Sequence, residues 1–90
     1  MAFPNSQDKV GERARCPCCG CRTLEAGADF EICPVCFWED DGQGDADADE
    51  VHYGPNHETS LTQARQNFRE FGACSRRFLQ QVRKPKPDEL

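Results

Sequence analysis

Long hydrophobic runs are absent from this sequence of 90 residues. Its first ten residues lack the apolar stretch of a secretion signal, and no later segment approaches the length of a membrane span. Hydrophobic residues make up only 37% of the chain and charged residues 30%. So small a chain buries a modest core, and such domains usually need disulfides or a metal ion for stability. We expect one small cytoplasmic domain with one of these cross-links.

The missing secretion signal also decides between the two cross-links. Cysteines in a reducing cytoplasm remain thiols, and clustered CxxC pairs in that setting indicate metal binding. The seven cysteines are an odd number and fit a complete set of disulfides poorly. The sequence therefore predicts a metal-binding domain.

Two CxxC motifs supply the metal ligands. Residues 16–20 read CPCCG and residues 33–37 read CPVCF. A two-residue spacer brings both sulfurs of a turn to one ion and directs backbone amides at them, and four thiolates suit tetrahedral Zn²⁺. Four protein ligands leave no position for water, so the predicted zinc ion is structural, although iron fits the same four sulfurs. The predicted ligands are Cys16, Cys19, Cys33 and Cys36.

A second CxxC frame overlaps the first motif, since Cys18 and Cys21 are also separated by two residues. We prefer the frame that begins at Cys16, because it places a proline after the first ligand in both motifs. It also places Gly20 directly after the second ligand, where a tight turn leaves little room for a side chain. The other thiols are then interpreted as packing residues: Cys18, Cys21 and Cys74.

The pattern around the cysteines predicts a small α+β metal-stapled domain, with a zinc-ribbon-like β-hairpin and one or two C-terminal helices. Short strands are expected at residues 23–25 and 30–32, joined by a turn at residues 26–29. A long loop follows, and Ser60 with Gln63 has the form of a helix capping box. Residues 61, 64, 68 and 71 form one apolar helical stripe, Gly72 ends that helix, and a second short helix is expected at residues 75–82. The expected parts are a flexible arm (1–14), a domain (15–83) with an acidic loop (39–58) and a helical segment (60–82), and a disordered tail (84–90).

Charge is unevenly distributed in this acidic chain, whose net charge is −5. The loop carries seven acidic residues and no basic one between residues 39 and 50, whereas the segment from Ser60 onward carries seven basic residues against three acidic ones. An acidic surface repels phosphate backbones, so nucleic acid is a disfavoured partner. The acidic loop instead suits a basic protein partner. Its candidate binding residues are Trp38, Asp40, Asp41, Asp45, Asp47 and Asp49.

Several of these residues also have simpler interpretations. Trp38 follows the last ligand directly and is expected to pack over the metal site unless it contacts a partner. The aspartates at positions 45, 47 and 49 have the spacing of a calcium loop, but that loop needs a glycine where Glu50 stands and a bidentate glutamate where Asn56 stands. A solvated acidic loop is therefore the default, and both histidines are interpreted as surface residues. The arginines of the helix are expected to be solvated or paired with the acidic loop.

The cysteine motifs, together with the FWEDDG run after Cys36 and the GPN run at residues 54–56, resemble the bacterial cysteine-rich CPCC family. The resemblance extends from residue 16 to Ala73 and leaves out the tail. It implies a small metal-binding protein without a settled activity. Family members occur beside polymorphic toxin genes, which implies an immunity role by association only.

Three functions follow from these features. The first is a zinc-stabilised protein-interaction module with no enzymatic activity, of the immunity type that covers a basic toxin. The second is a zinc ribbon that binds nucleic acid. The third is a thiol–disulfide oxidoreductase, which would need Cys33 at a helix N-terminus, yet the residues after Cys36 are a poor helix start. The oligomeric state and the identity of a partner are not evident from the sequence.

Overall fold

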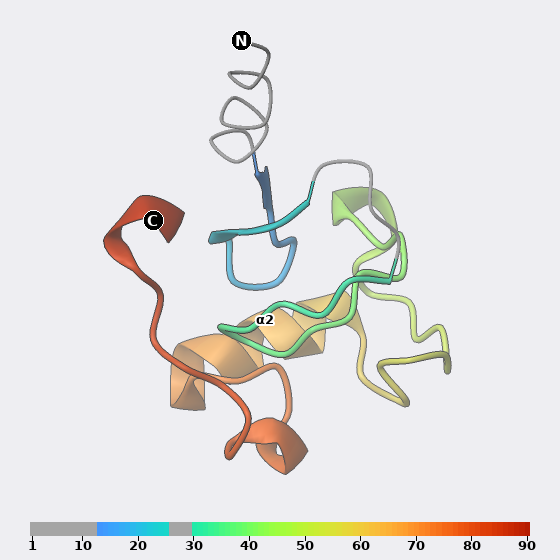
Figure 1. The fold of residues 1–90 in the computed structure, drawn as a ribbon. Coiled ribbons are helices and arrows are strands. Elements are labelled where there is room, and N and C mark those ends of the chain that lie inside the picture. The colour runs from blue at the N-terminus through green and yellow to red at the C-terminus, as the bar shows by residue number, and fades with distance from the viewer. Residues whose placement is uncertain (1–12, 26–29) are drawn as a thin grey trace, which may run out of the picture.

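The computed structural model describes residues 13–25 and 30–90 (Figure 1). Most of the predicted arm (1–12) and the predicted turn (26–29) lie outside the described residues, while Ala14 belongs to a strand. Within these described residues the elements are two short strands, one α-helix and three single-turn 3₁₀ helices. Their bounds are β1 (Ala14–Arg15), β2 (Arg22–Leu24), η1 (Asp45–Asp47), α2 (Leu61–Phe71), η2 (Arg76–Phe78) and η3 (Pro87–Glu89).

The hairpin differs from the predicted one, because each CxxC turn is itself the tip of a paired segment. Strand β1 pairs antiparallel with β2 across the first motif, with Ala14 opposite Leu24. Around the second motif, Ile32 and Glu39 form an isolated antiparallel bridge. The prediction of strands 23–25 and 30–32 as one hairpin is wrong in its pairing, since the cysteine turns bring their own flanking residues together.

Helix α2 agrees with its sequence signals. The Ser60 side chain accepts a hydrogen bond from the Gln63 amide, and Gly72 ends the helix in the left-handed region at φ 87°. Leu61 and Ala64 are fully buried, so the predicted stripe faces the core. After Gly72 the chain forms only the turn η2, capped by Ser75, in place of the expected helix 75–82. The following residues are largely exposed and give a longer helix little surface to bury.

The core lies between α2 and the two cysteine turns. Its largest side chain is Trp38, which is 0% exposed and packs in one cluster with Leu61, Val35 and the cysteines. The interpretation of Trp38 as a partner-binding residue is therefore wrong, and the packing interpretation holds. A large buried aromatic ring compensates for the low apolar content of the chain.

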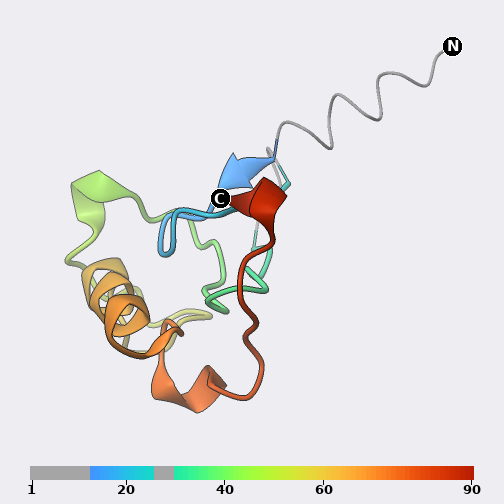
Figure 2. The same ribbon diagram turned by 90° about the vertical axis from the view of Figure 1, so that its left-hand side faces the viewer.

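The C-terminal residues 84–90 are ordered, so the predicted disordered tail is wrong. Glu89 is only 2% exposed, and its carboxylate accepts two hydrogen bonds from the Arg83 guanidinium at 2.9 and 2.8 Å. This pairing, with the Lys86 amide, lowers the pKa of Glu89 to about 2, so the carboxylate is charged at neutral pH. Turn η3 packs against β2, and the chain end lies beside the first cysteine turn (Figure 2). An ion pair between the buried Glu89 carboxylate and the partly exposed Arg83 side chain thus helps to hold the tail against the hairpin.

Candidate metal centre

The two CxxC motifs fold into the same backbone turn. The Gly20 amide donates to the Cys16 carbonyl at 2.8 Å, and the Phe37 amide donates to the Cys33 carbonyl at 2.7 Å. The residue after the second cysteine has a positive φ in both turns, 81° at Gly20 and 69° at Phe37. A phenylalanine is strained in this region, but its ring packs 4.8 Å from that of Phe78. In the first turn, glycine adopts the positive φ without strain. In the second turn, the packing of Phe37 against Phe78 stabilises the same backbone conformation.

Each turn also directs hydrogen-bond donors at its first sulfur. The Cys18 amide lies 3.4 Å from the Cys16 sulfur, and the Val35 amide lies 3.4 Å from the Cys33 sulfur. The buried hydroxyl of Thr23 donates to the Cys33 sulfur at 3.0 Å. These donors stabilise negative charge on sulfur, as the outer-shell hydrogen bonds of metal sites do. The Thr23 contact has no signal in the sequence, because it depends on how β2 lies beside the second turn.

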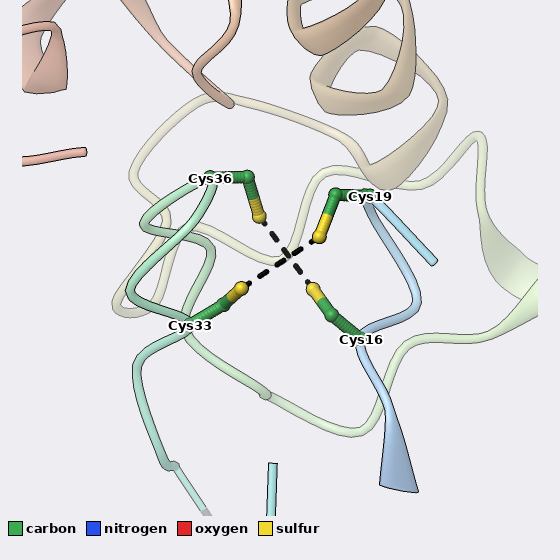
Figure 3. Close-up of side chains that lie close together, drawn as sticks. All are labelled: Cys16, Cys19, Cys33 and Cys36. Carbon is green, nitrogen blue, oxygen red and sulfur yellow. Dashed lines mark hydrogen bonds between the residues drawn. The ribbon is translucent and has the colours of Figure 1, made fainter. Parts of the chain in front are cut away.

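The four predicted ligands meet at one point (Figure 3). The Cys16 and Cys36 sulfurs are 3.5 Å apart, and the Cys19 and Cys33 sulfurs are 3.7 Å apart. All four lie within 4.8 Å of one another. A tetrahedral ion with metal–sulfur bonds of about 2.3 Å separates its ligands by about 3.8 Å. The arrangement therefore fits one tetrahedral metal ion. In the first motif the converging cysteines are Cys16 and Cys19, the pair that the preferred CxxC frame predicted.

The site is closed to solvent on most sides. Cys16, Cys33 and Cys36 are at most 1% exposed, and only Cys19 is partly accessible. Four sulfur ligands in a buried tetrahedron leave no position for a substrate or a reacting water, which is the arrangement of a structural site.

Without metal, the four thiols share protons. Hydrogen bonding with the neighbouring thiols, Cys16 above all, lowers the pKa of Cys33 well below its usual value. The same kind of contact, again chiefly with Cys16, raises the pKa of Cys36. The pKa of Cys19 is raised as well, and that of Cys16 is lowered. At neutral pH Cys19 and Cys36 therefore keep their protons, which a metal ion must displace.

Metal affinity is consequently expected to fall as the pH falls. Metal binding displaces the protons that Cys19 and Cys36 hold, because the pKa of each is raised. The affinity should therefore fall steadily from pH 8 to pH 6, since metal and protons compete for the same sulfurs. Competition with a chelator of known affinity at pH 6, 7 and 8 measures this slope. An affinity that does not change over this range would contradict the proton sharing.

Both turns are attached to distant parts of the chain through backbone carbonyls. The Arg65 side chain of α2 donates from Nε to the Pro17 carbonyl at 2.8 Å. The Arg83 amide donates to the Pro34 carbonyl at 3.2 Å, and the Cys74 amide donates to the Cys36 carbonyl at 2.8 Å. The helix and the tail thereby fix the position of one turn relative to the other. Sequence reasoning assigned no such role to these residues.

The three remaining thiols are packing residues in the structure, as expected. Cys18, Cys21 and Cys74 are all less than 9% exposed and belong to the core cluster. Burial raises the pKa of Cys74 to about 12, so its thiol stays protonated at neutral pH. It is therefore a poor nucleophile.

Comparison with known protein families gave a match. The family model described as Cysteine-rich CPCC matches residues 14–89. The chain belongs to this family. The match includes the C-terminal tail, so the resemblance noted from the sequence, which ended at Ala73, was drawn too short. Glu89 is buried in this chain, so the matched tail is part of the folded domain.

Comparison with curated proteins and with solved structures gave no significant match. Within residues 13–25 and 30–90, no helix of this CPCC chain has the length and apolar character needed to cross a bilayer.

The acidic loop is folded, and its calcium-like triplet, Asp45, Asp47 and Asp49, does not converge on one point. Asp45 pairs with Arg65 at 2.7 Å, the Asp47 carboxylate accepts from the Gly44 amide, and Asp49 accepts from the Thr62 hydroxyl. Since these three carboxylates face different partners, the structure lends no support to a calcium loop. The ion pair between Arg65 and Asp45 confirms the expected pairing of a helix arginine with the acidic loop.

The candidate partner-binding residues of the loop differ in exposure. The Asp45 side chain is 92% exposed and Asp49 is exposed as well. Asp40 and Asp47 are partly accessible, whereas the Asp41 side chain is 4% exposed. Asp41 is therefore removed from the candidate surface.

Proposed function

We propose that this CPCC protein is a zinc-stabilised interaction module that binds a basic protein partner and has no catalytic activity. The four-sulfur cluster supports the metal part of this proposal, because thiolates select zinc over the harder divalent ions. When bound, the ion supplies a fixed tetrahedral cross-link between the two turns. Cys16, Cys19, Cys33 and Cys36 would hold it, and the amides of Cys18 and Val35 would offset the charge of the thiolates.

The exposed acidic loop is the observation that carries the interaction part. Its backbone is fixed by Asn56, whose amide donates to the Glu39 carbonyl at 2.7 Å and whose side-chain oxygen accepts from the Glu39 amide at 3.0 Å. Buried Gln43 adds hydrogen bonds to the carbonyls of Asp47 and Glu50. A preformed surface with Asp45 and Asp49 exposed attracts a basic partner and loses little entropy on binding. A basic toxin bound by an immunity-type protein would be one such partner.

A double substitution of Asp45 and Asp49 to asparagine tests this function. The partner is first captured by the zinc-loaded protein from lysate of its host, identified by mass spectrometry and purified. The variant should then associate severalfold more slowly at low salt and dissociate at nearly the same rate, because exposed charges steer encounter. Asp88→Asn, on the exposed tail, is the matched control and should leave both rates unchanged.

Two outcomes would contradict the proposal. The first is that no protein is captured in a form that survives purification and rebinding. The second is an association rate that is the same for the wild type and the double variant. In either case the acidic loop is a solvated surface and not a binding site.

A further inference from the structure

A second group of metal-ligating side chains lies in the acidic loop, apart from the cysteines. His52 is at its centre, with Nε2 3.4 Å from Asp47 Oδ2 and 3.7 Å from Glu50 Oε1. One ligand atom from each of these three residues lies within 4.8 Å of the others. These separations are longer than a hydrogen bond. They are close to the spacing of about 3.0–3.4 Å between neighbouring ligands around an ion with bonds of about 2.1 Å.

The opposite edge of the imidazole faces a buried carboxylate. His52 Nδ1 lies 3.6 Å from Asp41 Oδ2, and the Asp41 side chain is 4% exposed. Asp41 is held in place by the Gln43 amide, which donates to its Oδ1 at 3.0 Å. A histidine that binds a metal through one nitrogen usually donates its other N–H to a carboxylate. At 3.6 Å the Asp41 carboxylate is not yet hydrogen-bonded to His52, but it lies where a small shift would let it accept that N–H. A proton on Nδ1 would leave the Nε2 lone pair directed at Asp47 and Glu50.

A buried amide holds the backbone of the two carboxylate residues in this cluster. Gln43 is 3% exposed, and its Nε2 donates to the carbonyls of Asp47 and Glu50 at 2.9 and 2.8 Å. Its Oε1 is fully buried and has no hydrogen-bond partner among the described residues. A buried carbonyl oxygen of this kind calls for a donor or a cation. Gln43 thus fixes the backbone of both carboxylate residues and leaves an unpaired oxygen inside the loop that bears them.

We propose that His52 Nε2, Asp47 and Glu50 form a second site, for a divalent transition-metal ion, with Asp41 as the residue that orients the histidine. One imidazole and two carboxylates suit borderline ions such as Zn²⁺ and Mn²⁺. The side chains of His52 and Asp47 are about one-third exposed and that of Glu50 is 68% exposed, so water completes the coordination. The ion would neutralise the carboxylates that lie against His52 and would add a cross-link within residues 47–52.

The test uses protein whose four-sulfur site already holds one equivalent of zinc. Calorimetry follows a further addition of Zn²⁺, and electron paramagnetic resonance follows Mn²⁺, a hard ion that does not displace thiolate-bound zinc. The wild type should bind one further ion. His52→Asn and Glu50→Gln should each weaken this binding at least tenfold, and Asp41→Asn about 10- to 100-fold. His57→Asn is the matched control, since His57 is exposed in the same loop and outside the cluster.

The site would be ruled out if the wild type bound neither ion below millimolar concentration. It would also be ruled out if His52→Asn bound the ion as tightly as the wild type, or if the control His57→Asn were weakened as much as His52→Asn. Far-UV circular dichroism and the retained first equivalent of zinc establish that each variant is folded. The outcome is separate from that of the partner test, which changes Asp45 and Asp49.

Discussion

Removal of the zinc ion is expected to unfold the two cysteine turns and, with them, most of the domain. Structural zinc contributes roughly 10–16 kcal/mol to folding in small peptides near neutral pH, as much as or more than the roughly 5–15 kcal/mol of an entire ordinary domain. Here the cysteines also make up a large part of the buried core, so the turns cannot separate without exposing Trp38. Addition of a strong chelator should abolish the near-ultraviolet circular dichroism of this single tryptophan and the dispersion of amide signals in NMR spectra.

Substitution of one ligand should have the same effect as the chelator. Cys33→Ser removes one of the four thiolates. The second turn has no spare cysteine to replace it, because Cys36 is already a ligand, so the variant should lose the metal ion and fold poorly. Cys21→Ser is the matched control, because Cys21 is buried beside the first turn but is not among the four converging sulfurs. A metal-free protein that keeps native dispersion, or a Cys21 variant that loses the metal ion, would show that the assignment of the ligands is wrong.

The second large effect is expected from Trp38→Ala. Truncation of a buried tryptophan typically costs about 3–5 kcal/mol, because it removes apolar contacts and leaves a cavity. Trp38 is 0% exposed and is the largest fully buried side chain among the described residues. Chemical denaturation of the zinc-loaded protein should therefore give a free energy of unfolding lower by about this amount.

Two further variants make this result specific. Trp38→Phe should be less destabilising than Trp38→Ala, because the ring retains much of the packing and the indole N–H has no hydrogen-bond partner among the described residues. Tyr53→Ala is the control, since Tyr53 is 78% exposed and should change stability by less than about 0.5 kcal/mol. If Trp38→Ala were as mild as Tyr53→Ala, the tryptophan would not be a core residue.

The metal site and α2 were predictable because their signals are local. A two-residue spacer fixes how far apart two sulfurs lie. In the first motif, the proline and Gly20 indicated the CxxC frame of Cys16 and Cys19, whose sulfurs converge in the structure. Ser60, the apolar stripe and Gly72 marked the helix in the same way. In each case the residues that decide the structure lie within one turn of it.

The parts that the sequence did not predict depend on contacts between distant residues. The ordered tail needs Glu89 to meet Arg83 and to lie against β2, and apart from Leu90 the sequence around it consists of charged residues and prolines. The Arg65 contact with the Pro17 carbonyl and the burial of Asp41 have the same origin. A charged residue in a polar stretch is exposed by default, and only the assembled fold supplies the partner that permits its burial.

The most direct test of the metal site is X-ray absorption at the zinc edge, on protein that holds one equivalent of zinc at neutral pH. Four equivalent sulfur neighbours at about 2.3 Å are expected. Nitrogen or oxygen in the first coordination shell, or fewer than four sulfurs, would contradict a single closed site formed by Cys16, Cys19, Cys33 and Cys36.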